Sequence, residues 1–122
     1  MQSFKKILLA VILLMGMSVS LSADEIVGTW VYDKKTSVAH EKNKDLKMIL
    51  GSAKTKNIVF DKNGNYGDRT KLVGKWKKTG LTNYEVTVPN DPLVKASIKK
   101  GHLIMVADMG DWGIWTMYYT KK

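Results

Sequence analysis

Few side chains in this sequence have the type and spacing that catalysis or metal binding requires. The chain of 122 residues contains no cysteine and two histidines, His40 and His102, which are far apart in the sequence. The lack of cysteine excludes disulfides, cysteine nucleophiles and cysteine-based metal sites. Glu85 is the one acidic residue within a predicted strand, and no second carboxylate is placed to act with it. We therefore expect no catalytic residues, no metal and no cofactor, and we do not expect an enzyme.

One short segment gathers oxygen-bearing side chains that calcium could use: Asp61, Asn63, Asn65 and Asp68. An EF-hand loop also needs glycine at its sixth position and an acidic residue at its twelfth. Counted from the first aspartate, these positions hold Tyr66 and Leu72, so the calcium pattern fails. The pair Asn63-Gly64 instead favours a type I′ turn, because both central residues of that turn need positive φ. We expect a β-hairpin here.

Lysine dominates the charge of the chain. There are 20 Lys and Arg residues against 11 Asp and Glu residues, which gives a net charge of +9. Lys71, Lys75 and Lys77 fall on one side of a predicted strand and would form an outward basic face. This face could simply serve solubility, or it could attract an anionic lipid, an acidic glycan or an acidic protein. Nucleic acid is a less favoured partner, because Arg69 is the only arginine available for bidentate phosphate contacts.

The first 23 residues have the three zones of a secretion signal. Lys5 and Lys6 form a basic start, residues 7–17 form an apolar run, and residues 18–23 are mostly small. The apolar run is shorter than the roughly 20 residues that a membrane-spanning helix needs, so we expect no transmembrane segment in the mature chain. No cysteine follows to carry a lipid anchor. These features predict a signal peptide over residues 1–23 and a mature domain over residues 24–122, in the periplasm or outside the cell.

The mature region is predicted to consist of short strands, with one short helix after the first strand. Residues 26–32 alternate between two faces, which is the period-2 pattern of a strand. In residues 43–53 the apolar side chains recur at helical spacing, and Asn43 is a candidate N-cap. Turn-forming residues then recur at 61–65, 79–80, 89–92 and 100–101, with strand patterns between them.

A sheet of about seven or eight short antiparallel strands with one apolar face must close on itself or be covered. One short helix can cover little of that face. We therefore predict an all-β fold, a small antiparallel meander β-barrel with the helix at one end. A barrel of this size either fills its interior with side chains or holds one small ligand.

Ten apolar or aromatic side chains are predicted to point into the barrel: Trp30, Phe60, Leu72, Trp76, Tyr84, Val86, Met105, Trp115, Met117 and Tyr119. They could form the solid core of a small domain, since each buried side chain of this size contributes about 1.5–3 kcal/mol. Alternatively, some of them could line a hydrophobic ligand pocket, with Trp30 closing its base. The side chains assigned to that pocket are Trp76, Tyr84, Met105, Trp115 and Tyr119.

The stretch Gly28-Thr29-Trp30 lies on the first predicted strand and resembles the G-x-W signature of the calycin superfamily, which includes lipocalins and fatty-acid-binding proteins. The order of elements is similar to that of small bacterial lipocalin-like domains. The resemblance implies a barrel in which Trp30 packs across the closed end and Gly28 lets a neighbouring segment approach. Family members usually carry an arginine on the last strand, whereas the only arginine here, Arg69, lies on an early one.

Two functions are compatible with these observations. The first is an exported lipocalin-like protein that binds a small apolar or amphipathic ligand in its barrel, in which case Trp76→Ala should weaken ligand binding. The alternative is a solid-core periplasmic module, for binding or inhibition, whose lysine-rich face engages an anionic macromolecule or a membrane surface. In that case reversing the charges of the three lysines on the basic face should abolish binding.

Overall fold

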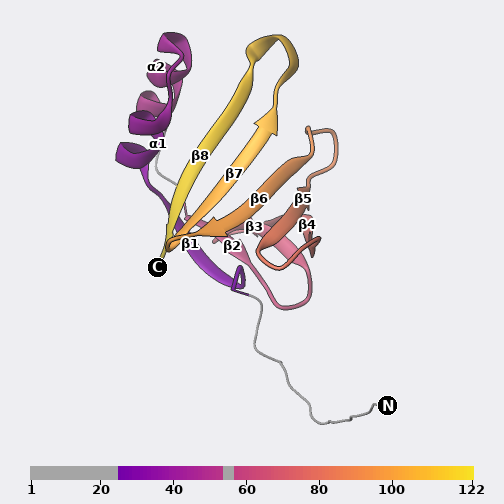
Figure 1. The fold of residues 1–122 in the computed structure, drawn as a ribbon. Helices are drawn as coiled ribbons and strands as arrows, with labels where there is room; N and C mark the ends of the chain where they lie inside the picture. The colour runs from indigo at the N-terminus through magenta and orange to yellow at the C-terminus, as the bar shows by residue number, and fades with distance from the viewer. Residues whose placement is uncertain (1–24, 54–56) are drawn as a thin grey trace, which may run out of the picture.

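The computed structural model describes residues 25–53 and 57–122, so the predicted signal peptide lies outside the described residues. The described part contains eight strands, two α-helices and one short 3-10 helix (Figure 1). In chain order these are β1 (Gly28–Tyr32), α1 (Lys34–His40), α2 (Lys44–Ser52), β2 (Asn57–Phe60), β3 (Asn65–Asp68), β4 (Leu72–Lys78), β5 (Asn83–Thr87), β6 (Val94–Lys99), β7 (His102–Asp108), η1 (Gly110–Trp112) and β8 (Ile114–Lys121).

The eight strands form a closed antiparallel barrel. Each strand pairs with the next one in the sequence, and β8 pairs with β1 to complete the ring. The β7–β8 hairpin has the longest register, from His102 opposite Thr120 to Asp108 opposite Ile114. Closure pairs every described strand on both sides, which removes the exposed edges that promote aggregation. The predicted small meander barrel is confirmed.

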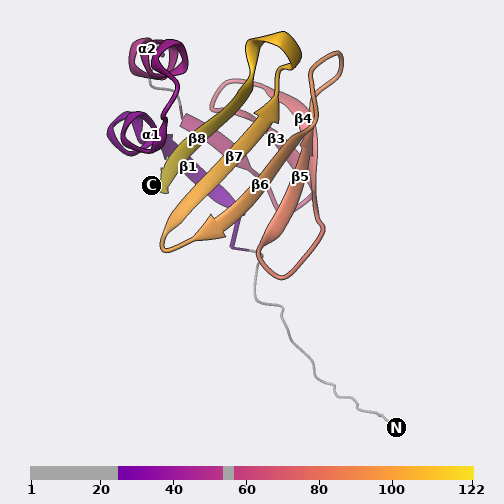
Figure 2. The ribbon, with the colours of Figure 1, turned by 45° about the horizontal axis from the view of Figure 1, so that its top comes forward.

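The connections divide the barrel into two ends, because alternate connections of an antiparallel sheet lie at the same end. The helix end comprises residues 33–53, which hold both helices, and the connections 69–71, 88–93 and 109–113. The turn end comprises the connections 61–64, 79–82 and 100–101. In Figure 2 the helix end is tilted toward the viewer, and the two helices stand beside β8.

The core lies inside the barrel because successive side chains of each strand alternate between its two faces. In β7, for example, Leu103, Met105 and Ala107 are buried, and the residues between them are partly exposed. The buried side chains form one cluster: Ile26, Trp30, Tyr32, Ile58, Phe60, Trp76, Tyr84, Val86, Ala96, Ile98, Leu103, Met105 and Tyr119. The prediction that Leu72 points into the barrel is wrong. Leu72 is the first residue of β4, at the helix end, and its side chain is half exposed.

The structure has two helices after β1, where the sequence analysis predicts one. The predicted helix is α2, and the side chain of Asn43 caps it by accepting hydrogen bonds from the backbone N–H groups of Asp45 and Leu46. The unpredicted helix is α1, which packs against β8 and against α2. It has seven mostly polar residues and buries only Ser37, so it lacks the apolar stripe that would reveal it. None of the helices in the described part is long and apolar enough to cross a membrane.

The predicted hairpin after β2 is present, but its turn is not type I′. Gly64 has a φ of +85°, whereas Asn63 does not have a positive φ. The N–H of Gly64 donates to the carbonyl of Asp61, and the Asp61 carboxylate accepts from the N–H groups of Asn63 and Asn65. Residues 62–64 thus form a three-residue loop between Asp61 and Asn65, and only Gly64 in it takes the left-handed conformation. The Asp61 carboxylate therefore holds this turn together, and that of Asp68 accepts from the N–H groups of Thr70 and Lys71 in the next connection.

Candidate functional site

Five of the six side chains predicted to surround a ligand are part of the buried core. Trp30, Trp76, Tyr84, Met105 and Tyr119 are each at most 9% exposed, and all belong to the central cluster. The sixth, Trp115, lies on the inward face of β8, nearer the helix end, and is partly exposed. The barrel interior toward the turn end is thus occupied by the protein's own side chains.

Contacts among these core residues are specific. The Trp76 ring meets the Tyr84 ring edge-on at 5.8 Å, and its Nε1–H donates to the carbonyl of Asp61 at 2.8 Å. The Tyr119 ring lies 5.6 Å from that of Tyr32, and burial strongly raises the pKa of the Tyr119 phenol. Trp76 therefore holds the β2–β3 turn, and Tyr119 remains a neutral core residue.

Trp30 is buried in β1, and its ring is contacted from the last strand. The Nζ of Lys121 lies 5.0 Å from the centre of the Trp30 ring and donates to the carbonyls of Glu25 and Val27, at 2.6 Å each. Partial burial lowers the pKa of Lys121, and the nearby Glu25 carboxylate opposes this effect. Lys121 thus provides a cation on the last strand, where the family resemblance implies an arginine. Glycine at position 28 leaves space for this side chain, since a Cβ atom there would lie 2.8 Å from Cε of Lys121.

The two histidines, which the sequence analysis leaves without a role, lie on either side of Tyr118. The His40 ring stacks on the Tyr118 ring at 4.7 Å, and the His102 ring meets its edge at 5.9 Å. The Nε2 of His102 lies 3.2 Å from a carboxylate oxygen of Asp33, the N-cap of α1. His102 therefore begins β7 and contacts both Asp33 and Tyr118.

This cluster has a structural explanation. Hydrogen bonds from the side chain and backbone of Thr36, and then from His102, lower the pKa of Asp33. The nearby Ser37 is buried, donates to the carbonyl of Asp33 and accepts from the N–H of Tyr118, so it is not a free nucleophile. Within residues 25–53 and 57–122, no three His, Asp or Glu side chains form a group that could hold a metal ion. The cluster joins α1 to β7 and β8.

The predicted basic face is interrupted by other groups. Lys71 precedes β4 in the turn at the helix end, and Lys75 donates from Nζ to the side chain of Asn65 at 2.7 Å. Lys77 forms an ion pair with Glu85 at 3.7 Å, and Glu85 is the register partner of Lys95 on β6. Lys77, Glu85 and Lys95 therefore form a row of alternating charge across β4, β5 and β6.

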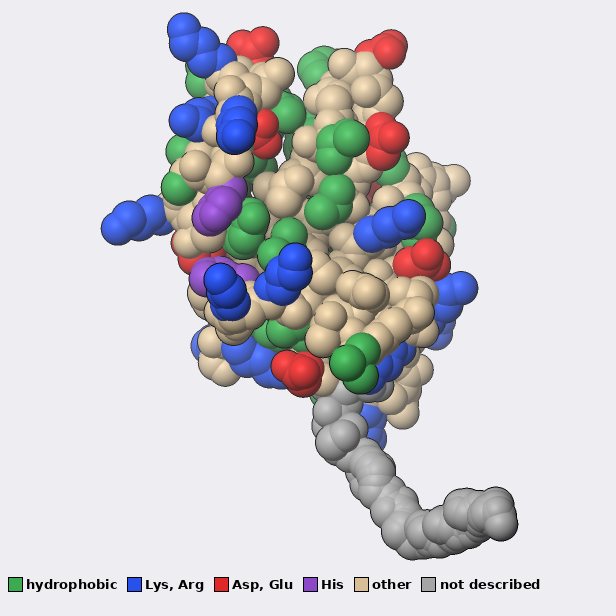
Figure 3. Space-filling model, viewed as in Figure 1, with side chains coloured by type: hydrophobic (Ala, Val, Ile, Leu, Met, Phe, Trp, Pro, Cys, Tyr) green, Lys and Arg blue, Asp and Glu red, His purple; other side chains and the backbone are tan. Residues whose placement is uncertain are grey.

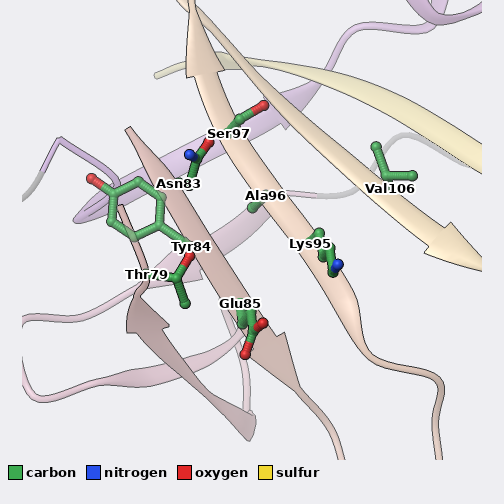
Figure 4. A pocket seen from close by; sticks show the side chains of 8 residues that line it. All are labelled: Thr79, Asn83, Tyr84, Glu85, Lys95, Ala96, Ser97 and Val106. Carbon is green, nitrogen blue, oxygen red and sulfur yellow. The ribbon is translucent and has the colours of Figure 1, made fainter. Parts of the chain in front are cut away.

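A groove of about 320 Å³ follows this row on the outside of the barrel. Figure 4 shows the side chains that line it: Thr79, Asn83, Tyr84, Glu85, Lys95, Ala96, Ser97 and Val106. Asn83 and Ser97 are register partners, as are Glu85 and Lys95. The groove thus offers neighbouring groups of opposite charge, which makes it a poor match for a purely anionic partner.

Exposed apolar side chains gather at the helix end. The described part exposes seven large hydrophobic residues: Met48, Leu72, Val73, Leu81, Leu93, Trp112 and Ile114. All except Leu81 lie in α2, in the connections of the helix end or at the first positions of β4 and β8. Trp112 is the most prominent, with a bulky ring that is 73% exposed. Exposed apolar side chains that gather at one end of a molecule make that end a candidate for a binding surface.

A cleft of about 430 Å³ opens between α2 and the β7–β8 loop at this end. Figure 3 shows the molecule hollowed between the part that holds the helices and the part that holds this loop. The side chains or backbone of the following residues line the cleft: Asn43, Asp45, Leu46, Ile49, Asp111, Trp112 and Gly113. Cavities of about 300–1,000 Å³ are typical of small-molecule sites. This cleft is the candidate functional site.

Local structure fixes both walls of the cleft. On one wall, α2 is capped by Asn43 and turns Leu46 and Ile49 toward the cleft. On the other, η1 holds Trp112: its N–H donates to Met109, and its carbonyl accepts from the Trp115 indole at 3.0 Å. The backbone of Trp112 is therefore fixed, and its ring remains free to contact a ligand.

Trp112 is not among the residues predicted from the sequence. It lies in the connection between β7 and β8 and not on the inward face of a strand, so it is absent from the candidates for the barrel interior. The signal that could have found it is a large aromatic side chain between Gly110 and Gly113, where a solvent-exposed turn would ordinarily be polar.

Comparisons of the chain with protein-family models, with curated proteins and with solved structures returned no match.

Proposed function

We propose that this protein is an exported, lipocalin-like barrel that binds a small apolar or amphipathic molecule at its helix end, in the cleft between α2 and the β7–β8 loop. The observation that carries the proposal is the position of Trp112. Its ring is 73% exposed beside a cleft of about 430 Å³ that also contains Leu46 and Ile49. The ligand is placed here, and not deep in the barrel, because the core side chains occupy the interior.

The exposed apolar rim favours binding over a purely structural role. Burying apolar surface is favourable by about 25 cal/mol per Å², so a chain gains little from leaving Trp112, Ile114 and Met48 in water. Their common location at one end indicates that a second molecule covers them in use. The closed barrel supplies the rigid frame that keeps the two walls of the cleft apart.

The export and family parts of the proposal rest on the sequence. The basic and apolar zones of residues 1–23 support secretion. The G-x-W stretch supports the lipocalin-like assignment, and so does the cation that Lys121 places over Trp30. A binding protein also fits the site better than an enzyme, because the aligned His102–Asp33 pair is used to join α1 to β7.

A neutral fluorescent probe can test the proposal. N-phenyl-1-naphthylamine fluoresces strongly in apolar surroundings and carries no charge that would direct it to the lysines. We expect saturable binding to the purified protein, and Trp112→Ala should weaken it by about tenfold, which is a typical loss for an aromatic side chain at a binding site. Leu81→Ala is the matched control, because Leu81 is 88% exposed at the turn end.

The two variants distinguish binding in the cleft from non-specific binding to exposed apolar side chains. Equal effects of Trp112→Ala and Leu81→Ala would show that the probe adheres to any exposed apolar side chain, and the proposal would be wrong. Unchanged affinity in Trp112→Ala, combined with loss of binding on changing the half-buried Met117, would move the ligand from the cleft to the barrel interior.

A further inference from the structure

We propose that the cleft selects cations: its ligand is an amphipathic molecule with a positively charged head, such as a quaternary or protonated amine on a short apolar chain. This inference rests on the proposed function, because it names the chemical class of the ligand for the same cleft. It follows from the charges that line the cleft and from the exposed aromatic ring beside them.

The charged groups that line the cleft are both negative. Asp45 comes from the first turn of α2, and Asp111 comes from η1 on the facing wall. The described residues that line the cleft include no lysine, arginine or histidine. Neither aspartate has an ion-pair partner within residues 25–53 and 57–122. In Figure 3, red side chains occur on both of the parts that flank the hollow, and the part that holds the helices also carries blue side chains.

This charge is opposite to that of the molecule as a whole. The chain carries a net charge of +9, and yet the cleft is acidic. A ligand attracted by the overall charge would be an anion, and the two carboxylates would repel it at the cleft. A cation is weakly repelled at long range, but it gains two short-range contacts once it is bound.

Trp112 adds a second interaction that favours a cation. The face of an indole ring attracts positive charge more strongly than the face of any other aromatic side chain does. Trp112 is held by backbone hydrogen bonds next to Asp111, and its ring is 73% exposed. Leu46 and Ile49 on the opposite wall provide apolar surface for the rest of the ligand.

The start of α2 also faces the cleft, and free N–H groups at a helix start would favour an anion. Here the side-chain oxygen of Asn43 already accepts the N–H groups of Asp45 and Leu46, at 2.9 and 3.1 Å. The Asp45 carboxylate lies in the same turn and adds a full negative charge. The cleft wall at the start of α2 thus carries a carboxylate, and the N–H groups of Asp45 and Leu46 are already occupied.

Three ligands of equal chain length, followed by calorimetry, test the inference: decyltrimethylammonium and decyl sulfate, each titrated below its micelle concentration, and decanol, titrated below its solubility limit. An exposed charge pair alters affinity by a factor of up to about five, and the cleft offers two carboxylates. We therefore expect the ammonium to bind about tenfold more tightly than the sulfate. Asp45→Asn with Asp111→Asn should remove this preference. Asp91→Asn is the matched control, because Asp91 lies at the helix end but outside the cleft.

The possible results separate this inference from the proposed function. If all three ligands bind equally and Trp112→Ala weakens each of them, the cleft binds apolar molecules and the selectivity for cations is wrong. If the ammonium is preferred equally in the doubly substituted protein, the preference arises elsewhere and the inference is also wrong. If no ligand shows binding that depends on Trp112, both proposals fail. All substitutions are at exposed positions, and circular dichroism will confirm that each variant is folded.

Discussion

Replacing Gly28 by alanine tests the closure of the barrel at Trp30. Gly28 has a φ of +133°, a conformation that an L side chain rarely adopts. A Cβ atom at this position would lie 2.8 Å from Cε of Lys121. The lysine side chain would have to move, and its ammonium would then leave the carbonyls of Glu25 and Val27 and the face of Trp30. The substitution therefore adds backbone strain and removes these contacts.

The magnitude follows from these two effects. Backbone strain at a residue of this kind costs about 1–3 kcal/mol. The lost hydrogen bonds and cation–π contact of a largely exposed lysine contribute about 1–2 kcal/mol more. We expect Gly28→Ala to lower the free energy of unfolding by about 2–5 kcal/mol, which lowers Tm by at least about 8 °C in a domain of this size.

Urea unfolding followed by tryptophan fluorescence can measure this change, and a double-mutant cycle can divide it. In a Lys121→Ala background the clash is absent, so Gly28→Ala should cost only its backbone strain, giving a coupling energy of about 1–2 kcal/mol. Gly101→Ala is a useful control, because Gly101 also has a positive φ, +81°, and a Cβ there would meet no atom within 4 Å.

Either of two results would refute this reasoning. If Gly28→Ala changes stability by less than about 0.5 kcal/mol, the size of an ordinary surface substitution, the backbone at this position is not strained. If it costs the same with and without Lys121, the lysine does not need the space that glycine leaves.

Two further predictions concern the helices. Asp33→Ala should lower the free energy of unfolding at pH 7 by about 1 kcal/mol, because it removes the cap of α1. Hydrogen bonds from Thr36 lower the pKa of Asp33 in the folded state. The contribution of Asp33 to stability is therefore present above its ordinary pKa of 3.8 and is lost as the pH falls through its lowered folded pKa. Urea midpoints of the two proteins that differ as much at pH 2 as at pH 7 would contradict this prediction. Gly51→Ala should raise stability by about 0.5–1 kcal/mol, because its Cβ would lie 3.6 Å from Val38 Cγ2 and alanine favours helix; a lower urea midpoint would show that the contact is unfavourable.

Patterns of alternation made the barrel predictable. Trp30, Tyr84 and Met105 lie at inward positions of strands whose neighbours alternate, and each is buried as expected. The second helix, α2, was predictable from a different local pattern, since Leu46 and Leu50 repeat at helical spacing behind an asparagine cap. These features are local, so they are readable in a single stretch of sequence.

Contacts between distant residues were not predictable in this way. Lys121 reaches Trp30 only because β8 closes the ring against β1, and nothing near either residue in the sequence indicates the pairing. The first helix, α1, also escaped prediction, because its stability depends on the Asp33 cap and on packing against β8 more than on an apolar stripe. Trp112 was not predicted, because it lies between two strands, where no alternation assigns a side chain to one face.

Composition and period-2 patterning are properties of short segments, so a small, basic, cysteine-free β-barrel and a start that resembles a secretion signal can be predicted from the sequence alone. Which aromatic residues belong to the core and which stay exposed depends on the folded barrel. Trp76 and Trp112 have the same side chain, yet the barrel buries one and leaves the other beside an acidic cleft. Burial depends on what the closed ring brings against each residue, and that information is spread over the whole chain.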